Sequence, residues 1–142
     1  MRIMFVSRGC SCRAPALVGI LRQRFPGWTV ACAGTDPVAP GKGPYKAMRD
    51  VAHLHGVDIS DVTTQRFKLS DFQAFDVFYA IDQATYDALQ MQRPAGVTCD
   101  IRLLAEGRIA DPYGQGKFGK VMQELTAAAG EISDDTTALR LG

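Results

Sequence analysis

Short apolar segments alternate with segments of helical periodicity along this chain, and this alternation limits the folds that it can adopt. Apolar runs predict buried strands at residues 2–6, 28–33 and 76–81, and a fourth within 97–104. Apolar residues at helical spacing predict helices at residues 15–25, 44–55, 83–92 and 117–129. Strands separated by helices are typical of a parallel sheet covered on both faces. The sequence therefore predicts a three-layer α/β fold with a four-stranded parallel sheet.

The length and composition favour one domain. The chain has 142 residues, of which 46% are hydrophobic and 22% charged, as in ordinary globular domains. We expect a single domain over residues 1–130. The polar segment that follows, residues 131–142, is expected to form a poorly ordered tail.

The charge and the apolar runs exclude two classes of partner. The net charge of +1 is too balanced for the broad basic face of a nucleic-acid-binding protein. No apolar run approaches the roughly 20 residues of a membrane span. The apolar run at residues 1–6 is too short for a secretory signal, so we expect a cytoplasmic protein that binds anions, if any, at a local site.

The loop after the first predicted strand is the default ligand site, because open parallel sheets bind ligands beyond the carboxyl ends of their strands. Pro15 suits the first turn of the helix that follows. Amide groups of such a loop, together with the helix N-terminus, attract a dianion. The planar guanidinium of Arg13 can bind two phosphate oxygens. The predicted phosphate-binding residues are Ser7, Arg8, Gly9, Cys10, Ser11, Cys12 and Arg13.

Residues 6–15 resemble the phosphate-binding loop of low molecular weight protein tyrosine phosphatases, whose pattern is Val-Cys-x-Gly-Asn-x-Cys-Arg-Ser-Pro. Further resemblances follow in the family's order: Cys32-Ala33-Gly34-Thr35, Asp71-Phe72, Phe75-Asp76, Ala80-Ile81-Asp82 and Asp111-Pro112-Tyr113. The resemblance implies that position 7 carries the nucleophile, that Arg13 stabilises the phosphoryl oxygens and that Asp111 protonates the leaving group. These three residues are the predicted catalytic set.

The sequence departs from the family pattern within this loop. Ser7 stands in place of the nucleophilic cysteine, Cys10 in place of asparagine and Ala14 in place of serine, while Arg8 adds a cation at the rim. A thiol has a pKa near 8.5 that a helix N-terminus lowers, whereas a serine hydroxyl is far less acidic. We therefore expect a protein that still binds phosphate or phosphorylated ligands and turns them over very slowly or not at all.

Several alternatives stay open from the sequence. Ser7 is either an engineered substitution that traps substrate in a genuine tyrosine phosphatase or a natural divergence, which the changes at positions 10 and 14 favour. An arsenate reductase needs a cysteine at position 7 and accessible resolving cysteines. Cys32 and Cys99 lie in apolar segments and are expected to be buried, so this interpretation ranks last.

The sequence predicts no metal and no cofactor. Cys10 and Cys12 could bind a soft metal or pair on oxidation, but no further Cys/His cluster completes a metal site. Cys12 is expected to face the loop interior and Cys10 to fill space. Residues 114–119 fit the pattern G-x-G-x-x-G, yet they follow a long loop where a dinucleotide site needs a strand. Asp82 is predicted to be a carboxylate that supports the site residues or the fold and takes no part in catalysis, and Tyr113 with residues 36–40 is predicted to form the rim.

Overall fold

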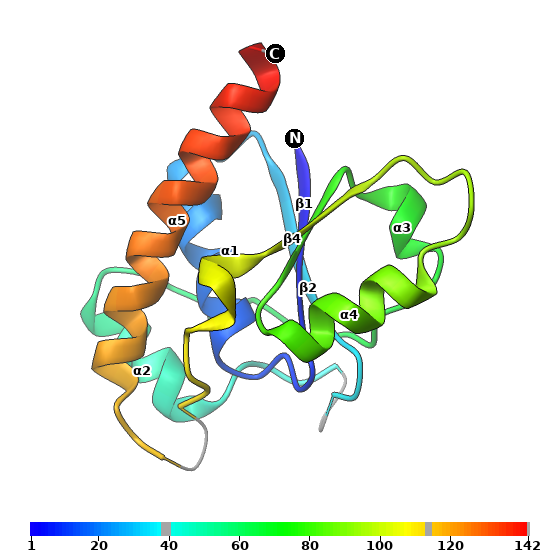
Figure 1. The fold of residues 1–142 in the computed structure, drawn as a ribbon. Coiled ribbons are helices and arrows are strands. Elements are labelled where there is room, and N and C mark those ends of the chain that lie inside the picture. Colours follow the sequence, from blue (N-terminus) through cyan, green and yellow to red (C-terminus); the bar gives the residue numbers. More distant parts are fainter. Residues whose placement is uncertain (38–40, 113–114, 142) are drawn as a thin grey trace.

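The computed structural model describes residues 1–37, 41–112 and 115–141 of the chain (Figure 1). Its first half contains β1 (Arg2–Ser7), α1 (Arg13–Arg24), β2 (Thr29–Gly34) and α2 (Lys46–Leu54). Its second half contains α3 (Asp71–Ala74), β3 (Val77–Ala80), α4 (Gln83–Gln92), β4 (Asp100–Leu103), the short 3₁₀ helix η1 (Leu104–Gly107) and α5 (Phe118–Leu141).

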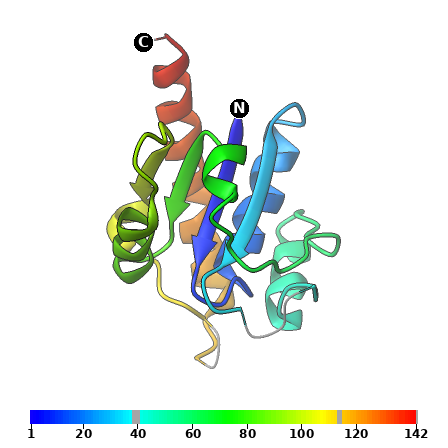
Figure 2. The ribbon, with the colours of Figure 1, turned by 90° about the vertical axis from the view of Figure 1, so that its right-hand side faces the viewer.

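The four strands form one parallel sheet in the order β2-β1-β3-β4. Helices α1 and α5 pack on one face, with α2 against α5, while α3 and α4 cover the other face (Figures 1 and 2). The predicted three-layer fold with a four-stranded parallel sheet is confirmed.

Strand β1 shows why the apolar runs predicted this fold. Ile3 and Phe5 point into the core beneath α1 and α5, while Met4 and Val6 point into the core on the α3 and α4 side. A parallel strand that is covered on both faces must be apolar at nearly every position. Each fully buried side chain of this size contributes about 1.5–3 kcal/mol of hydrophobic stabilisation.

The end of the chain differs from the sequence prediction. Helix α5 does not end at residue 129 but continues to Leu141, so the segment expected as a separate polar tail belongs to the helix. Ala128, Ala129 and Ile132 are buried and extend one apolar stripe past Gly130. A single helical glycine costs only about 1 kcal/mol, which this packing offsets.

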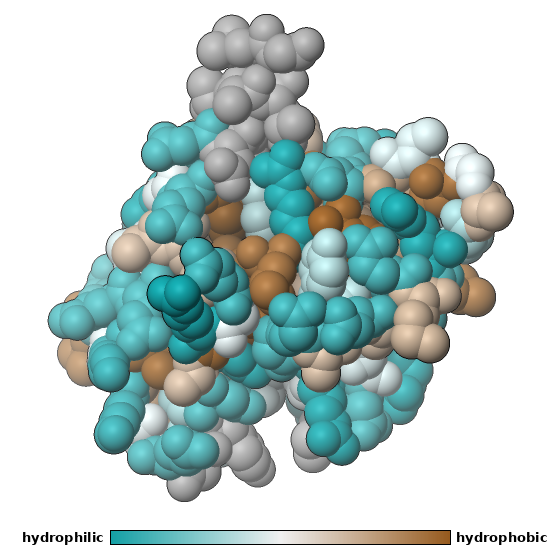
Figure 3. Space-filling view, in the orientation of Figure 1, coloured by the Kyte–Doolittle hydropathy of each residue, from teal (hydrophilic) through white to brown (hydrophobic). Residues whose placement is uncertain are grey.

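The surface in Figure 3 is mostly hydrophilic, with hydrophobic side chains showing between α5 and the sheet edge. A groove of about 450 Å³ there is lined by residues of β4, η1 and α5, and none of the predicted phosphate-binding residues lines it. Among the helices of the described ranges, none combines the length and apolar character that crossing a bilayer requires.

Candidate anion-binding site

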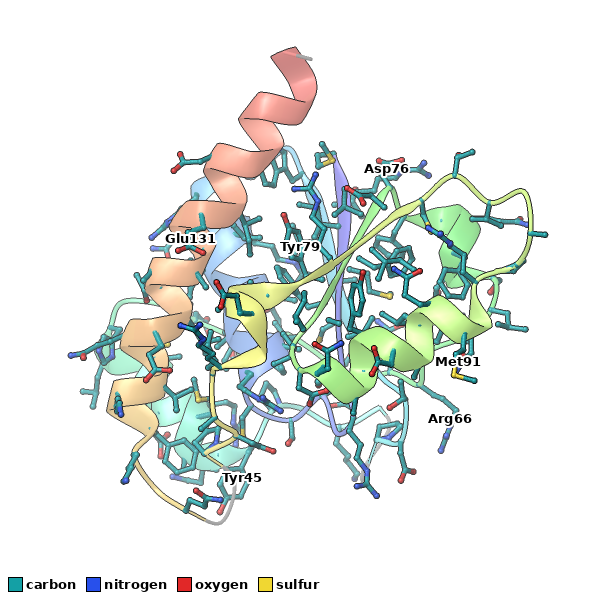
Figure 4. All side chains as sticks on the ribbon, viewed as in Figure 1. Tyr45, Arg66, Asp76, Tyr79, Met91 and Glu131 are labelled. Carbon is teal, nitrogen blue, oxygen red and sulfur yellow. The ribbon has the colours of Figure 1, made fainter. Side chains whose placement is uncertain are left out.

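The loop that follows β1 lies at the carboxyl end of the sheet and leads directly into α1. Neighbouring segments fix its backbone at three points. The carbonyl of Ser7 accepts the Thr35 N–H at 3.0 Å, that of Arg8 accepts the Asp36 N–H at 2.8 Å, and that of Ser11 accepts the Tyr45 N–H at 2.9 Å. Figure 4 shows Tyr45 at this end of the molecule. The chain entering α2 therefore holds one side of the loop, and the chain leaving β2 holds the other.

Cys10 makes the sharpest turn of the loop. Its φ of 53° lies in the left-handed region, which costs a non-glycine residue about 1–3 kcal/mol. Two hydrogen bonds stabilise this conformation: the Cys10 N–H donates to Ser7 Oγ at 2.9 Å, and Thr64 Oγ1 donates to the Cys10 carbonyl at 3.1 Å. Ser7 is 3% exposed, so its hydroxyl acts as a buried acceptor within the loop.

Several loop amides have no acceptor among the described residues. Within the ranges that the structure covers, no protein group accepts the N–H of Arg8, Gly9 or Ser11. Cys12 occupies the N-cap of α1, and its side chain makes no capping hydrogen bond. Unpaired amides beside a helix N-terminus are the donors that bind an anion.

Contacts with the protein itself hold the Arg13 side chain in place. Its side chain is only 10% exposed, and Nη1 donates to the Ile109 carbonyl at 2.8 Å. Nη2 lies 3.6 Å from Asp82 Oδ2 and 4.0 Å from Asp111 Oδ2. Arg13 and Asp111, which the sequence places together in the catalytic set, are thus neighbours in space.

Asp82 connects Arg13 to the sheet. Its Oδ1 accepts the Thr85 N–H at 2.8 Å and caps α4, while its Oδ2 faces the guanidinium of Arg13. This carboxylate therefore stabilises a helix and orients the arginine at the same time. The sequence prediction allowed Asp82 either to support the site residues or to be structural, and it did not name Arg13 as the partner.

Cys12 is a buried thiol that stays protonated at neutral pH. Burial and, to a smaller extent, the carboxylate of Asp111 raise the pKa of Cys12 to about 11, against the opposing effects of the Ser11 hydroxyl and the Arg13 guanidinium. A protonated thiol is a poor nucleophile and a poor metal ligand. Over the described residues, no three His, Cys, Asp or Glu side chains are placed to hold a metal ion.

Cys32 of β2 is buried, as expected. The neighbouring Cys10 and this burial raise the pKa of the Cys32 thiol well above its usual value.

The rim of the site is only partly within the described residues. Arg8 and Asp36 are 81% and 68% exposed and lie 3.8 Å apart, a solvent-screened pair of little net energy. His53 and His55 lie at the C-terminal end of α2, away from Tyr45 at its start. Tyr113 and residues 38–40, which were predicted for the rim, lie outside the described residues.

Comparisons with known proteins agree with this geometry. A family model described as low molecular weight phosphotyrosine protein phosphatase matches residues 2–139. A probable low molecular weight protein-tyrosine-phosphatase of Ralstonia nicotianae is 33% identical over 113 residues, covering 78% of this chain and 77% of that protein. A putative low molecular weight protein-tyrosine-phosphatase of Synechocystis is 29% identical and covers 93% of this chain and 94% of its own.

Solved structures share the fold. A tyrosine phosphatase of Erwinia amylovora superposes with a TM-score of 0.86 at 24% identity, over 94% of this chain and 91% of that one. Wzb of Vibrio vulnificus, solved in complex with benzylphosphonate, superposes with a TM-score of 0.84 at 24% identity, over 94% and 97%.

Proposed function

Because the chain belongs to the low molecular weight phosphotyrosine protein phosphatase family, we propose that it binds phosphate or phosphorylated ligands in the loop of residues 7–13 and hydrolyses them very slowly or not at all. One observation carries this proposal. Ser7 begins the loop at the position of the family's nucleophile, and its buried Oγ accepts the Cys10 N–H as part of an otherwise intact cradle.

The binding half of the proposal rests on charge and preorganisation. The amides of the loop and the N-terminus of α1 supply donors, and Arg13 is already ordered by the Ile109 carbonyl and Asp82. Ser7 is neutral, so it adds no negative charge where a thiolate would repel a bound dianion. Its own hydroxyl proton can donate to the ligand, because the bond from Cys10 uses Oγ only as an acceptor. Benzylphosphonate, with which Wzb of Vibrio vulnificus was solved, presents negatively charged oxygens on phosphorus, as a phosphorylated ligand does.

The proposal that hydrolysis is very slow or absent rests on the low acidity of the hydroxyl at position 7. A serine hydroxyl needs a general base, and the nearby carboxylates Asp82 and Asp111 both face the cation of Arg13. Cys12 cannot replace the missing thiolate, since burial keeps its pKa at about 11. The loop therefore retains the groups that bind the phosphoryl oxygens and lacks one that attacks phosphorus.

A second candidate function has one observation in its favour. Asp111 remains 4.0 Å from Arg13, where it could serve as general acid. A genuine phosphatase in which Ser7 was introduced to trap substrate would keep this arrangement.

An anion titration tests the binding proposal. Phosphate, sulfate and vanadate are titrated into the unmutated protein and into Arg13→Ala by calorimetry in low-salt buffer. The loss of a charge-assisted, bidentate contact is expected to weaken binding about tenfold or more. Arg24→Ala is the matched control, because Arg24 is exposed at the far end of the same helix. Absence of binding by the unmutated protein, or equal affinity in both arginine variants, would refute the proposal.

A further inference from the structure

Strand β4 forms one edge of the sheet, and its backbone is open on the outer side (Figure 2). The Asp100 N–H donates to the Asp76 carbonyl at 3.0 Å, which fixes the phase of the ladder between β3 and β4. Alternate residues of a parallel strand direct both backbone groups to the same side, so those of Asp100 and Arg102 face β3 and those of Ile101 face outward. Within the described ranges, neither a loop nor a side chain bonds to the Ile101 backbone on that side.

The other edge strand, β2, is closed in two places. Nε and Nη2 of Arg22 donate to the Val30 carbonyl at 3.1 and 2.9 Å. Near the end of the strand, the Gly34 N–H donates to the Gln65 carbonyl and the Phe67 N–H donates to the Gly34 carbonyl, both at 2.8 Å. Unpaired backbone groups on a strand edge are a template for another strand, and β4 is the more open of the two templates.

The charges of β4 make the strand complementary to itself. Asp100 and Arg102 lie on the same face of the strand, where Arg102 Nε donates to Asp100 Oδ2 at 2.7 Å. In an antiparallel pair centred on Ile101, the two Ile101 residues exchange their N–H···O bonds, and Asp100 of each copy lies opposite Arg102 of the other. Centring the pair on Arg102 instead would place two guanidinium groups opposite each other, so the charges select the register centred on Ile101.

We propose that β4 is a self-association surface, through which two copies of the chain pair antiparallel about a twofold axis and continue the sheet across both copies. Each copy gives and receives the same contacts in such a dimer. A pair of four-residue strands alone buries less than the roughly 1,000 Å² that a specific interface needs. The groove of about 450 Å³ beside β4, whose apolar lining includes Ile109, Ala127 and Ala128, supplies further contact area (Figure 3). The proposal does not rest on the proposed function, since β4 lies outside the loop of residues 7–13.

Charged side chains on a short edge strand have a rival role, which is to prevent pairing. The side chain of Arg93 covers the next outward position of β4, because its Nη1 donates to the Cys99 carbonyl at 3.1 Å. The two roles give opposite predictions for Asp100→Asn. If the carboxylate pairs with Arg102 of the other copy, its neutralisation weakens association, whereas if it keeps copies apart, its neutralisation promotes association.

Sedimentation velocity of the full chain, from micromolar to near-millimolar protein in low-salt buffer, tests the proposal. The unmutated protein should form dimers as its concentration rises. Asp100→Arg and Arg102→Asp should each raise the dissociation constant at least about tenfold, because each turns two attractive pairs into repulsive ones. The double variant, with both substitutions, should restore dimerisation. Asp50→Arg is the matched control, since it disrupts an exposed ion pair with Lys46, 2.8 Å long, on α2 and should leave association unchanged.

Amide hydrogen exchange, followed residue by residue by NMR, shows whether β4 forms the interface. Exchange of the Ile101 N–H should slow as the dimer forms, while the Arg102 N–H, which faces β3, should be protected at every concentration. Circular dichroism checks that each variant folds. Three results would overturn the proposal: an unmutated chain that stays monomeric throughout, a dimer that tolerates both single charge reversals, or a dimer in which exchange at Ile101 is unchanged. Stronger association of Asp100→Asn would assign the charges to the rival role.

Discussion

Gly34 of β2 lies close to the loop of residues 7–13, the proposed phosphate loop, and Gly34→Ala tests whether this contact shapes the site. The added Cβ would lie 2.8 Å from the Arg8 carbonyl oxygen, 3.2 Å from Pro37 Cβ and 3.3 Å from Cys10 Cβ. The closest of these atoms belongs to the backbone, and the same carbonyl accepts the Asp36 N–H at 2.8 Å. It cannot move without carrying the loop with it.

The size of the effect follows from these distances. A carbon–oxygen contact relaxes to about 3.3 Å or more, so the loop must shift by roughly 0.5 Å. Overpacking of a close-packed core by one methyl group costs about 1–3 kcal/mol. For a domain of this length, each kcal/mol lowers Tm by about 4 °C, so we expect a decrease of about 4–12 °C. Because the moved segment is the phosphate loop, phosphate affinity should fall about tenfold as well.

Two other glycines provide matched controls. In Gly19→Ala the new Cβ would overlap Ile59 Cγ2 and lie 2.9 Å from Val57 Cγ1, so this variant should also be destabilised, but away from the loop. In Gly130→Ala the new Cβ meets nothing within 4 Å, and the helix should gain about 0.5–1 kcal/mol. Calorimetric melting measures all three variants, and phosphate titration at a temperature where each is folded measures affinity.

The pattern across the series decides the question. Only Gly34→Ala should lose both stability and phosphate affinity. If Gly34→Ala melts like the unmutated protein, or loses stability as Gly19→Ala does while binding phosphate normally, the loop does not depend on this contact.

Two further predictions concern the nucleophile and the opposite end of the sheet. Ser7→Cys should hydrolyse p-nitrophenyl phosphate faster than a buffer control, because the helix N-terminus and Arg13 lower a thiol pKa. Adding Asp111→Asn should reduce that rate. No turnover by Ser7→Cys would mean that the changes at positions 10 and 14 already disable the loop. The hydrogen bond from Arg2 holds the pKa of Asp76 below its usual range. The stabilisation is therefore complete above about pH 4 and is lost as the pH falls through that lowered pKa. Because both side chains are about half exposed, Asp76→Asn should cost at most about 0.5 kcal/mol at pH 7, and its melting temperature should converge with that of the unmutated protein toward pH 2. Phosphate affinity should not change, since Asp76 lies at the far end of the sheet from Tyr45 (Figure 4), and a larger or pH-independent loss of stability would contradict the assignment.

The fold was predictable because the sequence encodes it locally. A strand buried on both faces, such as β1, must be apolar throughout, and this requirement is visible without any partner. The extension of α5 was not visible, because its polar residues obscured the buried stripe that includes Ile132. Polarity on one face of a helix predicts exposure of that face and does not predict where the helix ends.

The position of the loop between β1 and α1 was predictable and its internal contacts were not. The strand-loop-helix pattern places the loop amides and Arg13 at a helix N-terminus wherever the rest of the chain lies. Asp82 and the Ile109 carbonyl hold Arg13 in place. Both come from segments that only the assembled sheet brings to this point. The order β2-β1-β3-β4 places β1, which leads to Arg13, beside β3, which leads to Asp82, and that order depends on long-range pairing.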